Sequence, residues 1–578
     1  MLKKIMRDWP WLIEKLASFI KYLSPKIIYR KYKTALSIFH EFVSRKKVIK
    51  TSKNELVEIP YKKTRIVASI VDKFTSKQAS IDNLELITES LKKNDIEYFV
   101  VPGFSKIRYR IGIPREDRNK FFEVIKKEHD MSGLYMGVLR KRVVVKHTTL
   151  VKDESIRRRI RKARVVRFCK FSVDKNERAF AGMKYGCDVE FWRKGDNISE
   201  QDALLIGPKL GISIPIEDLP GSIVGPRRNK FSPFLTKSNQ VKSTIMINGK
   251  KHPTYNCFTN KHIDDIDFPV DVVYTWVNSN DAEWQKKHSK YKNNIKGKER
   301  NNGASRYTNR DELKYSLRSV SMYGDSIRNI YIVTDNQIPE WLDNKHPRIK
   351  VIDHKDIYSE KSALPIFNSH SIGSQLHHIK GLSDRYIYMN DDVFFGKQVD
   401  LNRYFTPSGI IRVVRSHHQF GVGLPTANES APSSAGKNVR ALLEHTFSKT
   451  ITNKFKHVPH PQIKEVGYEL EKRYPEAYKE TMRSRFRDKS DIAFAGILHH
   501  SYCLITGRAI ISSYRAGVVD IGHKDAGKKF NKILSDRRKL PSFCLNESVI
   551  SEDDSSRIDK QLKSFLESYF PFKAPWEK

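Results

Sequence analysis

The middle of the chain alternates short apolar runs with amphipathic segments. Four runs have the length and the β-branched or aromatic content of buried strands, at 270–277, 329–334, 348–353 and 386–389. Between the first two, Leu313, Leu317 and Val320 recur at helical spacing, and Thr308 with Asp311 resembles a capping box for this helix. Strands and helices in such alternation predict a Rossmann-like α/β domain built on a mainly parallel sheet.

The same pattern divides the rest of the chain into regions. Residues after 400 turn largely helical, and residues from about 211 to 267 are rich in Pro, Gly, Ser, Asn and Lys. We expect a basic N-terminal extension with an amphipathic helix at 1–79, a smaller accessory α/β domain at 80–210, a connecting region at 211–267, the main α/β domain with a helical C-terminal portion at 268–540, and a helical tail at 541–578.

Acidic residues mark two of the predicted strands. The strand at 386–389 runs into Asn390, Asp391 and Asp392. Ligands bind at the carboxyl ends of strands in open α/β sheets, and adjacent carboxylates there can hold Mg²⁺ or Mn²⁺ together with phosphates. A polar turn with solvated acids is the alternative. Asp271 interrupts the apolar strand that closes at Asn278, so it is either hydrogen-bonded scaffolding or functional.

Arginines gather near two predicted helix starts. Arg306 and Arg310 precede the helix at 313–320, and Arg485 with Arg487 lies on one side of an extended segment before another helix. Helix N-termini favour anions, and the guanidinium fork suits phosphate. These arginines are therefore candidate phosphate ligands, with ordinary surface arginines as the competing interpretation.

Two histidines lie in a proline-stiffened loop. His457 and His460 are three residues apart and in principle could bind zinc, but Pro459 and Pro461 oppose the helix that would align them, and no cysteine lies nearby in the sequence. Because histidine titrates near neutrality, a general base is the favoured interpretation of His460.

A further acidic pair lies nearer the N-terminus. Asp188 and Glu190 share one face of a predicted strand, because side chains alternate with period two. A second metal site is a minority interpretation of this pair.

The net charge of the chain limits the kinds of molecule that it is expected to bind. A net charge of +40 and a pI near 9.8 indicate an acidic partner or an anionic surface, such as nucleic acid, anionic lipid, a nucleotide sugar or a polyanionic product. The densest basic tract lies at 140–170, and it also contains apolar positions typical of ordinary structure. No recognisable DNA or RNA module accompanies the charge, so a nucleic-acid-binding protein is the least favoured class.

The cysteines and the N-terminal sequence indicate the cellular compartment of the protein. Five scattered cysteines, an odd number without paired spacing, argue against a disulfide framework and a structural zinc site, and favour a reducing compartment. We expect neither a signal peptide nor a bilayer-spanning segment. A cytoplasmic protein that lies peripherally on the inner face of a bacterial membrane fits this pattern, with a helix packed on its own domain as the alternative for the N-terminal segment.

Several blocks together resemble the Stealth family of capsular and exopolysaccharide phosphotransferases, which includes the animal N-acetylglucosamine-1-phosphotransferase. They cover about residues 268 to 510 and occur in the family's order: DVVYTWVN at 271–278, RDELKYSLRSV at 310–320, NIYIVTDNQIPEWL at 329–342, LPIFNSH at 364–370, YMNDD at 388–392, HVPHP at 457–461 and RFRDKSDI at 485–492. Ser279, Ile366 and Asp335-Asn336 depart from common family forms, which bears on substrate detail.

The resemblance implies transfer of a hexose-1-phosphate from a nucleotide sugar, usually a UDP-sugar, to a sugar hydroxyl, with release of UMP. Asp391 and Asp392 would hold the metal ion on the pyrophosphate, and His460 would take the acceptor proton, with Asp271 as the alternative base. Phosphate oxygens would be neutralised by arginines, and donor or sugar groups oriented by polar side chains, from the set Arg306, Arg310, Arg485, Arg487, Asn278, Asn368, Ser369 and Asn390.

A second enzyme class fits the same residues. In a metal-dependent glycosyltransferase of the nucleotide-diphosphosugar-transferase-like fold, the ion grips the same pyrophosphate but attack falls on the anomeric carbon, so UDP leaves instead of UMP. The leaving nucleotide therefore separates the two hypotheses.

Overall fold

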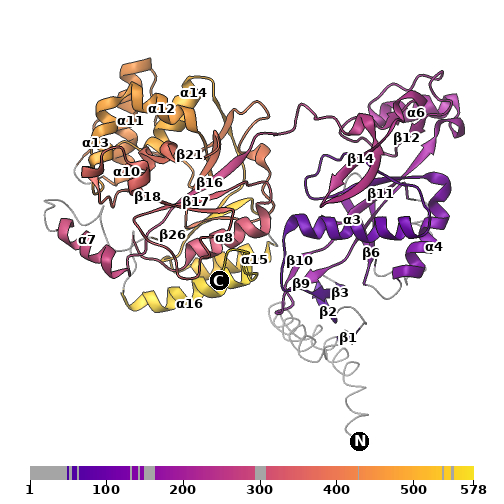
Figure 1. The fold of residues 1–578 in the computed structure, drawn as a ribbon, viewed down its shortest axis with the longest axis horizontal. Helices are drawn as coiled ribbons and strands as arrows, with labels where there is room; N and C mark the ends of the chain where they lie inside the picture. Colours follow the sequence, from indigo (N-terminus) through magenta and orange to yellow (C-terminus); the bar gives the residue numbers. More distant parts are fainter. Residues whose placement is uncertain are drawn as a thin grey trace, which may run out of the picture.

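The protein folds into two lobes. The structure, a computed structural model, describes residues 48–50, 55–61, 64–129, 133–140, 143–148, 163–292, 307–426, 429–536, 539–547 and 552–578. Figure 1 shows the N-terminal lobe in indigo to magenta beside the C-terminal lobe in pink to yellow. The predicted N-terminal amphipathic helix, most of the basic tract and Arg306 lie outside the described residues. Within the described part of the chain, no helix has the length and apolar character needed to cross a bilayer.

Two sheets build the N-terminal lobe. The larger has the order β13-β12-β11-β8-β6-β7, and β5 pairs in parallel with β11 and antiparallel with β4; the smaller has the order β1-β2-β3-β9-β10. The strands of the larger sheet are β4 (Phe99–Val100), β5 (Arg110–Pro114), β6 (Tyr135–Arg140), β7 (Val143–Thr148), β8 (Val165–Cys169), β11 (Cys187–Lys194), β12 (Ile223–Val224) and β13 (Phe234–Leu235). Those of the smaller sheet are β1 (Val48–Lys50), β2 (Glu55–Tyr61), β3 (Thr64–Ile70), β9 (Ser172–Val173) and β10 (Ala179–Ala181). The remaining elements are the hairpin β14 (Lys242–Ile247) and β15 (Lys250–Tyr255), and helices α3 (Ser76–Lys93), α4 (Arg118–His129) and α6 (Glu200–Leu210).

The lobe extends beyond the boundaries expected from the sequence on both sides. β2 and β3 come from the expected N-terminal extension, and β12 to β15 come from the expected connecting region at 211–267. β12 and β13 have two residues each, which is too short for periodicity to show, and β12 is stabilised by pairing with the longer β11.

Asp188 and Glu190 form an ion-pair network instead of presenting free carboxylates. Arg227 Nη2 lies 2.7 Å from Asp188 Oδ2, and its Nε donates to Glu190 Oε1 at 2.7 Å. Arg167 Nη2 also donates to Asp188 at 3.0 Å, and Arg110 lies 3.7 Å from Glu190. Three guanidinium groups thus compensate the two buried charges, which argues against the suggested second metal site.

A five-stranded sheet organises the C-terminal lobe. Its order is β18-β17-β16-β19-β23, in which the first four strands are parallel and β23 is antiparallel to β19. The strands are β16 (Val270–Thr275), β17 (Ile330–Thr334), β18 (Ile349–Asp353), β19 (Arg385–Asn390) and β23 (His460–Ile463). The near-continuous apolar runs of β16, β17 and β19 are buried in the main hydrophobic core, as expected of strands covered on both faces. The predicted Rossmann-like, mainly parallel α/β sheet is therefore confirmed.

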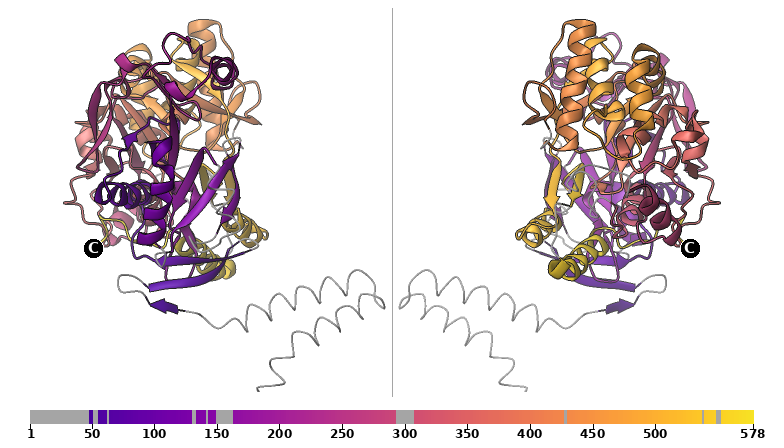
Figure 2. Two further views of the ribbon diagram at one scale, coloured as in Figure 1. Left: turned by 90° about the vertical axis from the view of Figure 1, so that its right-hand side faces the viewer. Right: turned by 90° about the vertical axis from the view of Figure 1, so that its left-hand side faces the viewer.

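Helices lie at both ends of this lobe. In Figures 1 and 2 the orange helices and the yellow C-terminal helices occupy opposite ends, with the central sheet between them. The helices are α7 (Ala282–Lys292), α8 (Glu312–Tyr323), α9 (His354–Ile357), α10 (Ser369–Ser374), α11 (Ala431–Phe447), α12 (Lys464–Arg473), α13 (Pro475–Arg483), α14 (His499–Ile505), α15 (Ala526–Ser535) and α16 (Glu552–Tyr569). Two small sheets, β20-β26-β25 and β22-β21-β24, complete the lobe with β20 (Val393–Phe395), β21 (Ile411–Gln419), β22 (Asn453–Phe455), β24 (Ala509–Ser512), β25 (Gly517–Asp520) and β26 (Ser542–Asn546).

An aromatic contact joins the lobes. Phe74, just before α3, packs against Tyr323 at the end of α8, with 6.3 Å between ring centroids, and against Phe572 at 6.0 Å. Ser76 Oγ donates to the carbonyl of Met322 at 3.1 Å. The N-terminal lobe therefore packs on the far end of α8, the helix whose first residue reaches the candidate site.

Candidate functional site

The site forms where β19, β16 and β23 meet. Asn390 ends β19, and Asp391 and Asp392 follow in the turn to β20. In the antiparallel pair, His460 of β23 lies opposite Tyr388, two residues before Asn390. The Tyr388 hydroxyl lies 3.2 Å from Thr275 Oγ1 at the carboxyl end of β16. Sheet pairing thus brings the imidazole and the two carboxylates, far apart in sequence, to one edge.

A third carboxylate, Glu312, joins the two aspartates. Burial and the charge of Asp391 raise the pKa of Glu312 to about 8, and burial with the charge of Asp392 raises the pKa of Asp391 to about 7. Asp392 Oδ1 is buried and has no hydrogen-bond partner. The three carboxylates raise one another's pKa, but among the described residues the ligand atoms within 4.8 Å of one another around Asp392 are those of His457 and Cys544. A Mg²⁺ or Mn²⁺ ion held by Glu312, Asp391 and Asp392 would therefore draw these carboxylates closer together, with the unpaired Asp392 Oδ1 as one ligand.

The start of α8 explains how Glu312 reaches the cluster. The predicted capping box of Thr308 and Asp311 is wrong: α8 begins at Glu312, and Asp311 takes a left-handed conformation with φ of 64° and makes no side-chain cap bond. Arg310 N–H instead donates to Glu312 Oε2 at 2.7 Å. Glu312 was not among the predicted site residues, although it lies inside one of the family-like blocks; an acid at the first position of a helix was the available signal.

His457 and Cys544 lie beside Asp392. His457 Nδ1 is 3.0 Å from Cys544 Sγ, and the thiol donates to Asp392 Oδ2 at 3.3 Å. The other ring nitrogen of His457 is 3.0 Å from Asn390 Nδ2. Burial and the charge of Asp392 raise the pKa of Cys544 well above its usual value, so the thiol is protonated and donates. Cys544 is distant in sequence but adjacent in space, which sequence spacing could not show.

His460 is poised as a neutral imidazole. Burial, with the neighbouring His500 and His457, lowers the pKa of His460 well below its usual value. Its ring centroid is 5.0 Å from that of His500. A neutral imidazole has a free nitrogen lone pair at neutral pH, which is the form a general base needs.

Arg487 and Ser369 lie on the same side of the sheet. Arg487 Nη2 donates to Ser369 Oγ at 2.7 Å. Burial raises the pKa of Tyr388, and the hydrogen bond with Thr275 and the nearby positive charge of Arg487 oppose this shift. Arg487 is therefore close enough to Tyr388 to act on the edge where Asp391 lies.

Two predicted ligands from neighbouring loops are scaffolding instead. Arg485 Nε donates to the carbonyl of Pro365 at 2.9 Å, and its guanidinium stacks 4.3 Å from the Tyr291 ring centroid. Asn368 is fully buried, and its amide donates to Asp491 Oδ2 at 2.8 Å. Both side chains fasten the 362–369 loop to the 484–491 segment, and this placement argues against direct contact of either with substrate.

Two more predicted groups point elsewhere. Arg310 Nε donates to Glu547 Oε2 at 3.1 Å, and its guanidinium also pairs with Asp559 of α16. Asp271, in the opposite half of β16 from the site, accepts from Arg328 Nε at 2.9 Å and from the Ser383 amide at 2.8 Å. The scaffolding interpretation of Asp271 therefore fits, because its charge is compensated where it is buried.

Asn278 follows the carboxyl end of β16. Its backbone N–H and carbonyl bond to the Gln337 side chain, both at 2.9 Å, and its own Oδ1 accepts from the Asn280 amide at 3.1 Å. Asn278 thus shapes the turn at this edge of the sheet. With Arg306 outside the described residues, Asn278, Ser369, Asn390 and Arg487 are the predicted binding residues that lie near the edge.

The shifted carboxylates predict an unusual pH dependence. Asp391 and Glu312 bind protons more tightly folded than unfolded, so between about pH 4.5 and 8 the contribution of these two groups to the free energy of unfolding of the metal-free protein falls as pH rises. Mg²⁺ should reverse this loss, so we expect it to raise the melting temperature more at pH 8 than at pH 6. Glu312→Gln should reduce both effects. Thermal unfolding in EDTA and in Mg²⁺ measures this, and an equal Mg²⁺ effect at both pH values would contradict it.

Four conserved regions of one family match the chain. Stealth protein conserved region 1 matches residues 268–296, region 2 residues 306–413, region 3 residues 456–503 and region 4 residues 531–578. Glu312, Asp391 and Asp392 lie in region 2, His457 and His460 in region 3, and Cys544 in region 4. The residues that meet at the sheet edge thus come from three of the four regions.

Curated relatives align with most of the chain. The exopolysaccharide phosphotransferase SCO6023 of Streptomyces coelicolor is 32% identical over 86% of this chain and 82% of its own length. SCO2592 of the same organism is 34% identical over 86% of this chain, which spans about half (51%) of that longer relative. CpsY of Mycobacterium tuberculosis, also named an exopolysaccharide phosphotransferase, is 34% identical over 64% of this chain and 70% of its own length.

Solved structures show a weaker likeness. The galactosyltransferase LgtC aligns with 52% of this chain and 95% of its own, at 12% identity and a TM-score of 0.27. Mouse xyloside xylosyltransferase 1 aligns with 48% of this chain and 98% of its own, at 10% identity and a TM-score of 0.24. At these scores the likeness carries no argument about the site.

Proposed function

Because the chain belongs to the Stealth family and is a transferase, we propose that it moves a hexose-1-phosphate from a UDP-sugar to a saccharide hydroxyl, forms a phosphodiester and releases UMP. One observation carries the proposal: Glu312, Asp391 and Asp392 are electrostatically coupled carboxylates, and strand pairing puts the neutral imidazole of His460 opposite Tyr388, three residues before Asp391. Phosphoryl transfer depends chiefly on positioning and on charge neutralisation, and this edge supplies groups for both.

The carboxylates would hold the ion. Asp391, Asp392 and Glu312 are its proposed ligands, and a bound Mg²⁺ would neutralise charge on the diphosphate oxygens. His457 and Cys544 fix the orientation of Asp392 through the contacts given above. Without these contacts the Asp392 carboxylate would be free to rotate away from the cluster.

The base and the arginine act on the two reactants. His460 accepts the proton of the acceptor hydroxyl as that oxygen attacks phosphorus, and the bond between the two phosphates breaks so that UMP departs. Arg487 neutralises phosphate oxygens from the other side, with Ser369 holding its guanidinium. Asn278 and Asn390 orient the donor.

An open cleft beside Arg487 is the proposed place for the acceptor. It has a volume of about 600 Å³. It is lined by three basic and three acidic residues and by three others: Lys479, Arg483, Arg487, Glu476, Glu480, Asp488, Ser484, Phe486 and Ser490. Its mixture of basic and acidic side chains suits a saccharide with occasional phosphates. The net charge of +40 further supports an anionic polysaccharide product or a membrane surface as the partner, on the inner face of the cytoplasmic membrane.

The leaving nucleotide tests the proposal. With a panel of UDP-sugars, Mg²⁺ and short capsule-type oligosaccharides, we expect UMP and a new phosphodiester signal in phosphorus NMR, and we expect EDTA to abolish both. Matched reactions with Asp384→Asn, an exposed acid at the opposite end of β19, should proceed as in wild type. Release of UDP without a phosphodiester would replace this proposal with the glycosyltransferase alternative.

A further inference from the structure

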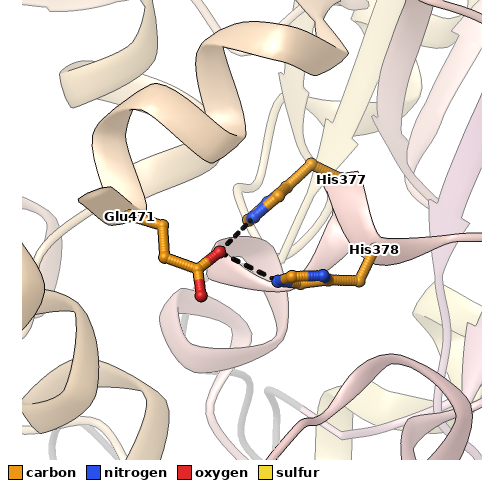
Figure 3. A group of neighbouring side chains, drawn as sticks. All are labelled: His377, His378 and Glu471. Carbon is orange, nitrogen blue, oxygen red and sulfur yellow. Dashed lines mark hydrogen bonds and ion pairs between the residues drawn. The ribbon is translucent and has the colours of Figure 1, made fainter. Parts of the chain in front are cut away.

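A second group of possible metal ligands lies apart from the carboxylate cluster. Figure 3 shows His377 and His378 pointing to one carboxylate, that of Glu471 on the neighbouring helix α12. His377 Nε2 is 2.9 Å and His378 Nε2 is 3.0 Å from the same oxygen, Oε2 of Glu471. The three ligand atoms lie within 4.8 Å of one another. Nothing in the proposed transfer reaction uses this group.

Local structure holds the group in place. The two histidines end the short helical turn Leu376–His378, and His377 packs so closely on α12 that a Cβ at Gly467 would lie 2.5 Å from its Cγ. Glu471 is four residues after Gly467, so it projects from the same face of α12 one turn later. The Tyr468 hydroxyl donates to the His377 carbonyl at 3.0 Å. The ligands are thus arranged before any ion binds.

Burial and exposure suit a bound ion. The side chain of His377 is 4% exposed, whereas those of His378 and Glu471 are 25% and 31% exposed, which leaves an opening for an ion and its water. Imidazole nitrogens and a carboxylate oxygen are common ligands of divalent transition metals.

We propose that His377, His378 and Glu471 bind a divalent transition-metal ion, with Zn²⁺ as the best match. Two imidazoles and one carboxylate form a ligand set found in open four-coordinate zinc sites, with water in the fourth position. Ligand atoms roughly 2.0–2.1 Å from a tetrahedral ion lie about 3.3 Å apart, so the present 2.9 and 3.0 Å separations need to widen only slightly.

The ion would join two segments that lead to the candidate site. His378 lies seven residues before Arg385, the first residue of β19, and α12 begins directly after β23, which carries His460. A metal bond between these segments would stabilise the pairing of β19 with β23 from outside the sheet edge. Its role is therefore structural, and the chemistry at Asp392 does not include it.

The competing interpretation is a hydrogen-bonded trio without metal, in which both histidines donate to Glu471. A calorimetric titration of the full chain with Zn²⁺ distinguishes the two interpretations. We expect one ion to bind at this group and to raise the melting temperature, and we expect Glu471→Gln to weaken binding at this group by about tenfold or more. Cys544→Ser is the matched control, because Asp392, His457 and Cys544 form the other possible metal-binding group among the described residues. It should leave this binding intact.

Two results would overturn the proposal: absence of Zn²⁺ binding at micromolar concentrations, or equal affinity in wild type and Glu471→Gln. Loss of all binding in Cys544→Ser would assign the ion to the other group and would also overturn it. If Glu471→Gln does not fold, His378→Gln decides in its place, because this side chain is partly exposed and its replacement leaves no buried charge. Co²⁺ gives an independent readout, since its visible absorption reports four-coordinate binding and should be lost in the same variants.

Discussion

Asp392→Asn is expected to lower turnover by about a hundredfold or more while leaving the fold intact, because it removes one charge from the ion-binding cluster. Asparagine keeps the shape of the side chain and can still accept the hydrogen bond from Cys544. Turnover with saturating UDP-sugar, measured over a range of Mg²⁺ concentrations, tests this. We expect the variant to need more Mg²⁺ and to stay slow even when the ion is saturating.

The control for this variant is Asp384→Asn. Asp384 pairs with Arg385 at the amino end of β19 and is exposed, so its charge is far from the cluster. It should leave turnover near the wild-type value. Wild-type turnover in Asp392→Asn would remove Asp392 from the mechanism and, with it, the argument for an ion at this edge.

His460→Gln is expected to lower turnover to a similar extent, by about a hundredfold, because glutamine cannot accept the proton of the acceptor hydroxyl. The pKa of His460 is well below its usual value, so the wild-type imidazole stays neutral as pH falls from 8 to 6. Protonation of His460 should therefore not limit the wild-type rate in this range. The pH profile of kcat under saturating Mg²⁺ tests this.

A histidine in the other lobe supplies the control. His262 is part-buried; its backbone N–H donates to Asp265, and its ring nitrogen Nδ1 accepts from the Asp264 amide. Because these contacts are local, His262→Gln should preserve both turnover and its pH profile. If His460→Gln loses turnover only in proportion to lost thermal stability, His460 is a structural residue and another group takes the proton.

The central sheet could be predicted from sequence because its strands are apolar on both faces. β16, β17 and β19 are read directly from runs of valine, isoleucine and tyrosine, and the acids after β19 mark its end. The short strands β12 and β13 carry no such signal. A two-residue strand is too short to show an alternation of apolar and polar positions, and these two strands are stabilised by pairing with their neighbours in the sheet.

The site was predictable in part. Asp391, Asp392 and His460 stood out by residue type and context, and strand pairing puts His460 opposite Tyr388, three residues before Asp391. Glu312 and Cys544 did not, because an ordinary helix-start acid and an isolated cysteine become notable only through their neighbours in space. The sequence could not show the partners of Arg310 and Arg485, because the carboxylates or carbonyls that engage their guanidinium groups come from distant segments.

Helix α8 connects the contact between the two lobes to the candidate site. The last residues of α8, Met322 and Tyr323, contact Ser76 and Phe74 of the N-terminal lobe. Its first residue, Glu312, belongs to the carboxylate cluster of the candidate site. A twelve-residue helix is a stiff rod about 18 Å long. Separating the lobes would expose Tyr323 and Phe572 to solvent and remove contacts at the C-terminal end of α8, so we expect the C-terminal lobe alone to be less stable than the full chain.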